Sequence, residues 1–279
     1  MLLVAGVSAE PMIAATIALQ WDLPSVVVVQ HAIDPAREAL VRTVSDVSGI
    51  VEREEIDLEH ACTSCAIRED VVPTLERLAA SGRWEVLIAQ LPVTAEPTQV
   101  SRVIESYPAA APHVRIGAVV VALDGESLTD DLVGDDLIVE RGLPVREDDP
   151  RGIAETAAAF VEYADLVSLY GEASSEGREL VTALARPGVD VVDGLSSVDA
   201  TSLLVGIHSH PESEDWVSPL CAAPASRPTE NVWTLDFRSE RPFHPHRFRD
   251  NIEALGRGRR RSRGCFFLSS RPGQICQWD

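Results

Sequence analysis

The stretch Val114–Leu123, which reads VRIGAVVVAL, decides the fold class of this chain. Its three consecutive valines and their apolar neighbours leave no polar face, so both sides of the segment must be covered. Continuous runs of this kind are typical of strands in parallel sheets, which helices cover on both faces. Similar runs occur at Leu2–Ala5, Val26–Gln30 and Glu85–Gln90. The sequence therefore predicts a buried parallel sheet.

Helical patterns separate these runs along the first 205 residues. We expect helices at Met12–Gln20, Ile67–Ala80, Pro97–Tyr107, Glu155–Tyr163 and Ser175–Ala185, further strands at Ile50–Ile56, Asp165–Leu169 and Val189–Val192, and an amphipathic region at His31–Val41. Alternation of strands with helices predicts a doubly wound α/β domain, which we place at residues 1–205.

The composition changes after about Leu204. Residues 206–230 are polar, acidic and rich in proline, so we interpret them as a linker between domains. His208 and His210 lie in this segment beside several carboxylates. Two interpretations stay open for them: a metal site, and incidental histidines of a solvated linker.

A second, smaller domain of α+β type is expected at residues 231–279. Asn231–Phe237 alternates as a strand does, His246–Leu255 has a helical pattern, and Cys265–Ser269 and Gln274–Trp278 read as strands. The sequence stops at Asp279 without turn residues, so we expect this domain to be incomplete.

Composition excludes several classes of protein. Apolar residues make up 45% of the 279, which indicates a globular chain, and no apolar run is long enough to span a membrane. Five cysteines and the absence of a basic leader favour the cytoplasm. A net charge of −20 disfavours general attraction to nucleic acid, although arginines concentrate between Arg257 and Arg263. All 24 basic residues are arginine.

A pair of cysteines precedes the helix expected at Ile67. Cys62 and Cys65 are separated by Thr63 and Ser64, which allows a turn that aims both sulfurs at one point. Tetrahedral Zn²⁺ takes thiolate and imidazole ligands, and Glu59 and His60 are the nearest candidates to complete such a site. Two other interpretations stay open: a redox pair activated by the helix N-terminus, and two unrelated buried cysteines.

Three separated segments resemble the CobW family of metal-handling GTPases. The cysteine segment Cys62–Asp70 is followed by Leu75–Leu78, as in that family, while Arg241–Phe248 and Gly264–Pro272 are similar to its C-terminal domain. The resemblance implies a P-loop-like fold for the first domain, zinc as cofactor, and a CobW C-terminal-like second domain.

The chain departs from the family at each nucleotide-contacting position. Gly6–Thr16 keeps one glycine and has no lysine, Ala89–Pro92 replaces a Glu-Thr-(Ser/Thr)-Gly-like turn, and Tyr170–Ala173 stands where Asn-Lys-x-Asp should follow. Lysine and Mg²⁺ supply most of the charge stabilisation in phosphoryl transfer. We therefore expect a non-enzymatic, degenerate P-loop protein; the alternative is a zinc metallochaperone that has kept GTP binding.

The lost motifs, together with Ser64 between the two cysteines, are similar to a degenerate actinobacterial subgroup of the family. That resemblance implies a zinc-responsive protein of the zinc-starvation response, with the ribosome and a hibernation factor as partners. The arginine segment could contact ribosomal RNA, because guanidinium groups suit phosphate oxygens; its residues are Arg257, Arg259, Arg260, Arg261 and Arg263.

Overall fold

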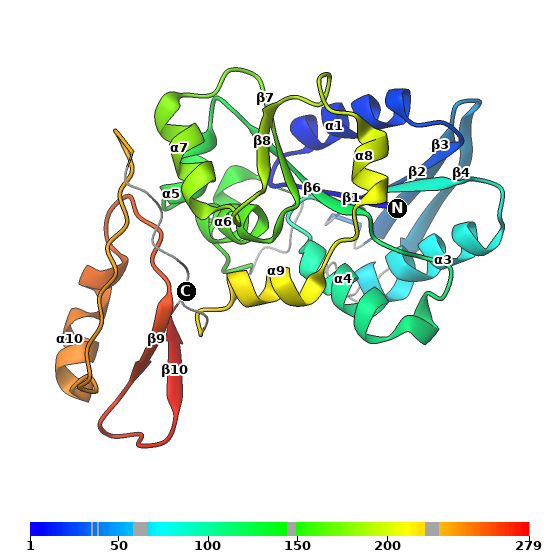
Figure 1. Cartoon of the computed structure of the whole chain (residues 1–279). Helices are drawn as coiled ribbons and strands as arrows, with labels where there is room; N and C mark the ends of the chain where they lie inside the picture. Colours follow the sequence, from blue (N-terminus) through cyan, green and yellow to red (C-terminus); the bar gives the residue numbers. More distant parts are fainter. Residues whose placement is uncertain (35, 38, 58–65, 144–148, 221–228, 279) are drawn as a thin grey trace.

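A computed structural model describes residues 1–34, 36–37, 39–57, 66–143, 149–220 and 229–278. Its main part is built on an eight-stranded sheet in the order β4-β3-β2-β5-β1-β6-β7-β8 (Figure 1). The strands are β1 (Leu2–Ala5), β2 (Val26–Asp34), β3 (Ala39–Asp46), β4 (Gly49–Asp57), β5 (Val86–Gln90), β6 (Ala118–Asp124), β7 (Leu166–Tyr170) and β8 (Asp190–Asp193). The predicted α/β class with a large parallel sheet is confirmed.

Pairing in the sheet is parallel from β2 through β5, β1, β6 and β7 to β8. The edge is different, because β2, β3 and β4 form an antiparallel meander. The sequence analysis gave His31–Val41 only as an amphipathic region and missed its strands: β2 continues to Asp34, and β3 begins at Ala39. Polar residues at Gln30, Arg42 and Thr43 hid this hairpin from a search for continuous apolar runs.

Helices cover both faces of the sheet. α1 (Ala9–Asp22) and α8 (Ala200–Val205) contact each other on one face. The opposite face carries α3 (Val72–Ala80), α4 (Pro97–Ser106), α5 (Leu128–Val133), α6 (Ile153–Tyr163), α7 (Ser175–Leu184) and α9 (His210–Val217), and a π-helical turn, η1 (Ile67–Val71), leads into α3. Two short 3₁₀ turns, Pro108–Ala110 and Ile138–Arg141, complete the connections.

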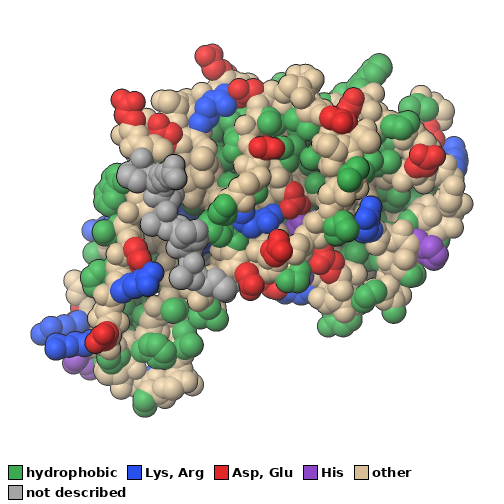
Figure 2. Space-filling view, viewed as in Figure 1, with side chains coloured by type: hydrophobic (Ala, Val, Ile, Leu, Met, Phe, Trp, Pro, Cys, Tyr) green, Lys and Arg blue, Asp and Glu red, His purple; other side chains and the backbone are tan. Residues whose placement is uncertain are grey.

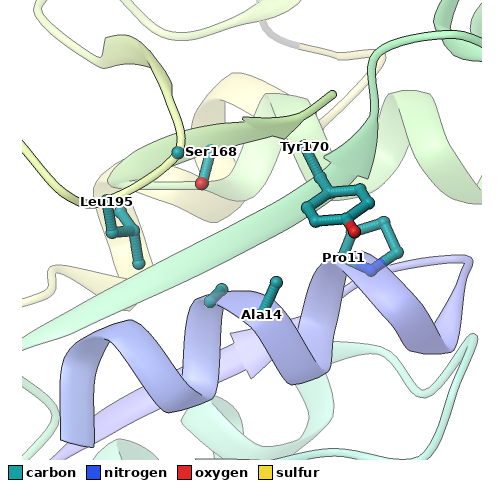
Figure 3. A pocket seen from close by; sticks show the side chains of 7 residues that line it. Pro11, Ala14, Ser168, Tyr170 and Leu195 are labelled. Carbon is teal, nitrogen blue, oxygen red and sulfur yellow. The ribbon is translucent and has the colours of Figure 1, made fainter. Parts of the chain in front are cut away.

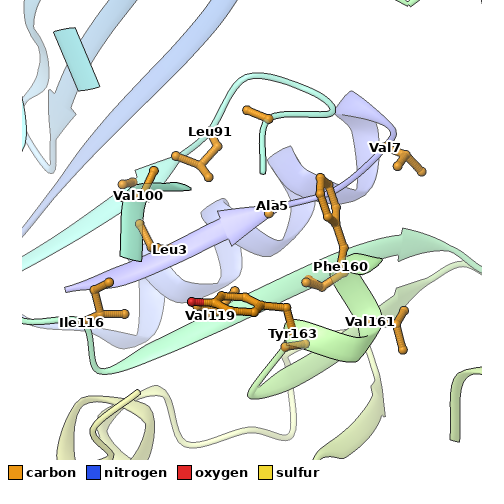
Figure 4. Close-up of a cluster of buried hydrophobic side chains, with 14 of the residues drawn as sticks. Leu3, Ala5, Val7, Leu91, Val100, Ile116, Val119, Phe160, Val161 and Tyr163 are labelled. Atoms are coloured by element: carbon orange, nitrogen blue, oxygen red, sulfur yellow. The ribbon is translucent and has the colours of Figure 1, made fainter. Parts of the chain in front are cut away.

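The two faces of the sheet have separate apolar cores, because side chains alternate between faces along each strand. Leu3 and Val119 point to the α4 and α6 side, where Phe160 and Tyr163 of α6 pack on them (Figure 4). Leu2, Val4 and Val120 point to the α1 side. Every residue of β1 is fully buried, which explains why its short run carries no polar side chain.

The C-terminal part consists of α10 (Pro245–Gly256) and an antiparallel pair, β9 (Gly264–Phe267) and β10 (Ile275–Trp278). Phe243, Phe248 and Phe266 form its aromatic cluster, with ring centroids 4.7–5.5 Å apart. The strand predicted at Asn231–Phe237 is not formed; these residues are in no helix or strand. Among the described residues, no helix has the length and apolar character needed to cross a membrane.

Candidate metal centre and the first strand-to-helix turn

The turn between β1 and α1 occupies the place where a phosphate loop would lie. Gly6 is packed so closely that a Cβ atom there would lie 2.5 Å from the carbonyl oxygen of Ala122 and 2.9 Å from Cγ of Met12. The buried Thr16 hydroxyl lies 2.8 Å from the Met12 carbonyl and 3.0 Å from Oε1 of Gln90. The Thr16 hydroxyl is therefore bonded within the chain.

The N-terminus of α1 faces a carboxylate of the protein itself. Glu10 lies in the first turn of this helix, where a negative charge interacts favourably with the helix dipole. Tyr170, at the end of β7, donates its hydroxyl to Oε1 of Glu10 at 2.9 Å. Figure 3 shows the Tyr170 ring beside Pro11, at the rim of a small cleft of about 50 Å³. That cleft is smaller than the roughly 300–1,000 Å³ of typical small-molecule sites.

The predicted metal ligands Glu59, His60, Cys62 and Cys65 lie outside the described residues. The elements on either side of them are described: β4 ends at Asp57, and η1 begins at Ile67. Ala66 is fully buried against Ile33 and Leu40. The chain that follows Cys65 is therefore fixed directly against the β2–β3 hairpin.

Asp70, in η1, anchors that turn through a buried ionic cluster. Its Oδ2 lies 2.8 Å from Nε2 of His31, and its Oδ1 accepts a hydrogen bond from Arg42. His31 and Arg42 are register partners on β2 and β3, so both side chains reach the same face of the sheet. Arg42 also bonds Thr74 at 3.0 Å and pairs with Glu54.

The charge of Asp70 requires that the ring nitrogen of His31 facing it carries a proton. Burial opposes ionisation of Asp70, but the hydrogen bond from His31 and the charge of Arg42 outweigh it and hold the pKa of Asp70 below its usual value. An ionised carboxylate only accepts hydrogen bonds, so Nε2 of His31 carries the proton. Nδ1 of His31 is buried and has no hydrogen-bond partner within the described parts of the chain.

His31 was not singled out in the sequence, because a lone histidine at the end of an apolar strand carries no motif. Only the antiparallel hairpin and the position of Asp70 reveal its environment. The described residues contain no group of three or more His, Cys, Asp and Glu side chains placed to hold a metal ion.

The two histidines expected in a linker are buried instead. His208 is 2% and His210 is 4% exposed, and His210 begins α9, which packs on α4 and α6. His208 lies 2.7 Å from Asp165 and 2.9 Å from the Tyr163 hydroxyl, which in turn lies 2.7 Å from Nδ1 of His210. For residues 208–217 the solvated-linker interpretation was wrong, because tertiary partners satisfy these polar groups.

The arginine segment is divided between internal contacts and solvent. Arg261 and Arg263 both reach the carboxylate of Glu162 at 3.3 Å, and Glu162 is only 1% exposed. Arg263 also donates to the Trp216 carbonyl of α9 at 2.6 Å. In contrast, Arg257, Arg259 and Arg260 are exposed, and Arg257 and Arg259 pair with Glu253 and Asp130 at the surface.

The sheet order, the two helical layers and the tight turn after β1 define the main part as a doubly wound α/β domain. Comparisons with known proteins are consistent with a particular family. Residues 38–170 match the family model described as the nucleotide-binding domain of CobW/HypB/UreG.

Two relatives extend this match. A zinc chaperone of Mycobacterium tuberculosis is 27% identical over 265 residues, which cover 89% of this chain and 63% of the relative. The zinc-regulated GTPase metalloprotein activator 1 of Dictyostelium discoideum is 19% identical over 243 residues, or 80% of this chain and 51% of that protein. This chain thus spans about 63% of the length of the mycobacterial protein. The domain match and these relatives show that the chain is similar to CobW-type proteins.

Among solved structures, the Zn(II)-bound YjiA GTPase of E. coli matches 69% of this chain and 56% of its own, with 14% identity and a TM-score of 0.40.

Proposed function

We propose that this chain binds Zn²⁺ through Cys62, Cys65 and His31, and that it acts in zinc handling without hydrolysing GTP. The observation that carries the proposal is the state of His31: a buried imidazole whose Nε2 is held by a carboxylate and whose Nδ1 has no partner in the described parts. Metal-binding histidines commonly have this arrangement, with the second ring nitrogen donating to a carboxylate.

The position of the cysteines along the chain supports this ligand set. Cys65 directly precedes Ala66, which packs against Ile33 on the same strand as His31. Two thiolates and one imidazole leave one tetrahedral position, for which Glu59 and His60 are candidates. Bound Zn²⁺ would link the hairpin to the segment before α3, so its occupancy would be coupled to local folding.

The relatives give independent support for zinc. One is called a zinc chaperone and another a zinc-regulated metalloprotein activator. Absence of GTP hydrolysis is supported by the sequence of the first turn, which has no lysine, and by Glu10 at the α1 N-terminus. A carboxylate at that point would repel a phosphate.

Metal content per chain of the purified protein tests the proposal. We expect about one zinc in the parent chain, and none in the Cys62→Ala/Cys65→Ala variant. His31→Ala should lower zinc affinity strongly, whereas His113→Ala, which removes an exposed histidine, should not. The zinc affinity of a His60→Ala variant decides whether His60 or Glu59 is the fourth ligand. A parent chain without zinc, or a His31→Ala variant that binds zinc as the parent does, would contradict the proposed ligand set.

GTP turnover is a separate measurement. We expect none above the blank with Mg²⁺ present, with or without zinc. Turnover above the blank that disappears on Thr16→Ala would instead favour the metallochaperone that uses GTP.

A second proposal concerns the ribosome, which the similarity to the degenerate actinobacterial subgroup suggests as partner together with a hibernation factor. The supporting observation is the exposure of Arg257, Arg259 and Arg260 in the C-terminal part. Figure 2 shows basic side chains gathered at the lower left of the view, over the C-terminal part. Phosphate contacts give binding that weakens steeply with salt.

Co-sedimentation with ribosomes over a salt series tests this second proposal. Replacing the three exposed arginines with serine should weaken binding and reduce the slope of log affinity against log salt. Arg271→Ser is the control, because it removes one exposed arginine outside the segment. Weaker binding with an unchanged slope would contradict a phosphate contact.

A further inference from the structure

Helix α1 is apolar on its outer side as well as on the side that faces the sheet. Met12 and Leu19 are buried in the core beneath the helix. On the outer side, Ile13, Ile17 and Trp21 are 40%, 49% and 86% exposed. Side chains four positions apart lie above one another on a helix, so these three form one outer stripe. A helix that is apolar all round is normally covered by other parts of a protein. The described parts of the chain leave the outer stripe uncovered.

The surface beside the outer stripe can accept a second helix. Ala14 follows Ile13 on α1, and its small side chain allows close approach of another helix. Ala14 also lines the small cleft, and Figure 3 shows Ser168 and Leu195 facing it across that cleft. A cleft of this size has room for a few water molecules or for one small side chain. An apolar stripe with such a cleft beside it has the form of an interaction site.

The two ends of the outer stripe are negatively charged. Glu10 precedes it, and Asp22 directly follows Trp21. Both carboxylates bond to neutral groups: Glu10 accepts from the Tyr170 hydroxyl at 2.9 Å, and Asp22 accepts from the backbone N–H of Ala200, the first residue of α8, at 2.8 Å. These bonds leave the negative charge of each carboxylate in place, so the stripe lies between two acidic groups.

Positive charge is scarce on this side of the sheet. The sequence has no lysine or arginine in residues 1–36, which contain α1, or in residues 187–226, which contain α8. Arg115 reaches this layer at the C-terminal end of α8, where it bonds the carbonyl of Leu204 at 3.4 Å. A negative surface repels nucleic acid and anionic lipid, and a second copy of this chain would add its own net charge of −20. The complementary partner is therefore both apolar and basic.

We propose that the outer stripe docks an amphipathic helix of a partner protein, which carries basic side chains at both ends of its apolar face. Glu10 and Asp22 are about 18 Å apart along α1, at a rise of about 1.5 Å per residue. A partner helix that lies along α1 meets both carboxylates with basic residues about three turns apart, and it packs aliphatic side chains on Ile13, Ile17 and Trp21 between them. Because α1 and α3 cover opposite faces of the sheet, this inference is independent of the proposed zinc site.

A pair of designed peptides tests the chemistry of the surface. The probe is a helix-forming peptide of about 18 residues, with leucines on one face and an arginine at each end of that face. Its control peptide carries glutamate at the two arginine positions. Trp21 fluorescence reports docking, and a Trp21→Phe variant identifies its signal among the five tryptophans. We expect the arginine peptide to bind at least about tenfold tighter than the glutamate peptide, with affinity that falls as salt is added.

Variants of the chain then locate the site, with binding measured by titration calorimetry. Ile17→Ser should weaken binding of the arginine peptide about five- to tenfold, because it removes apolar contact area. Val47→Ser is the matched control and should have no effect, since Val47 is 88% exposed in the turn between β3 and β4. Glu10→Gln with Asp22→Asn should remove most of the preference for arginine, while both acceptor oxygens are kept.

Three results would overturn the inference. The first is equal binding, or no binding, of the two peptides. The second is an Ile17→Ser variant that binds the arginine peptide as the parent chain does. The third is a dimer of the parent chain in sedimentation velocity that disappears on Ile17→Ser, which would make a second copy the occupant of the outer stripe.

Discussion

Replacing Asp70 with asparagine should destabilise the main domain through the buried cluster beside the cysteine segment. The carboxylate is 10% exposed, and it holds both the 9%-exposed side chain of Arg42 and the imidazole of His31. Removing one partner of a buried ion pair costs about 3–5 kcal/mol in free energy of unfolding. Arg42 keeps Glu54 and Thr74, and asparagine keeps an acceptor oxygen, so we expect a loss of about 2–3 kcal/mol.

Urea unfolding followed by tryptophan fluorescence measures this loss, and the corresponding fall in Tm is roughly 5–10 °C. Glu76→Gln is the matched control on α3. Its carboxylate pairs with His113, whose side chain is 59% exposed, so the cost should stay below about 1 kcal/mol. If the Asp70→Asn variant is no less stable than the Glu76→Gln variant, the cluster does not anchor the segment after Cys65. If zinc binds as proposed, Asp70→Asn should also weaken zinc binding about 10–100-fold, as loss of a carboxylate behind a metal-binding histidine does.

Three further predictions concern other parts of the fold. Burial lowers the pKa of His210 below the value of the unfolded chain, although the carboxylates of Glu214 and Glu105 oppose this. The contribution of neutral His210 to stability is therefore complete above about pH 6.5 and is lost as the pH falls through the folded pKa. His210→Gln should flatten that part of a curve of stability against pH. Gly6→Ala should cost about 1–3 kcal/mol in urea unfolding, because its Cβ would lie 2.5 Å from a carbonyl oxygen, while Gly264→Ala, with nothing within 4 Å, should be nearly neutral. Glu162→Gln should reduce hydrogen-exchange protection in β9 and β10 more than Glu253→Gln does, since Glu162 is buried against Arg261 and Arg263 and Glu253 is exposed.

The sheet could be predicted from the sequence because its strands are buried on both faces and therefore lack polar interruptions. The runs at Leu2–Ala5 and Val119–Val121 are fully buried, as their sequence predicts. The β2–β3 hairpin could not be predicted in the same way. Its inward side chains include His31 and Arg42, which are buried only because Asp70 comes to them from η1.

The same reason explains the error at residues 208–217. His208 and His210 look solvated in the sequence, since nothing local satisfies them. Their partners, Asp165 and Tyr163, lie more than 40 residues earlier and meet them only in the folded chain. Conversely, Asn231–Phe237 alternates as a strand should, yet alternation specifies only which side chains share a face. It does not supply the neighbouring strand, which the described structure of one chain lacks at this segment.

Binding of a polyanion to the arginine segment would affect the stability of the C-terminal part, because the same guanidinium groups take part in both. The chain carries a net charge of −20, and three arginines of its C-terminal part pair with carboxylates of the main domain. Arg261 and Arg263 contact Glu162 through buried groups, whereas Arg259 pairs with Asp130 at the surface. A phosphate must displace the carboxylate from whichever guanidinium it binds. Exposed pairs are weak and salt-sensitive, so Arg259 can exchange partners at little cost, while Arg261 and Arg263 cannot without exposing Glu162. If a polyanion binds and the hydrogen-exchange protection of β9 stays unchanged, it therefore uses only the exposed arginines. If binding lowers this protection, the C-terminal part has detached from α6.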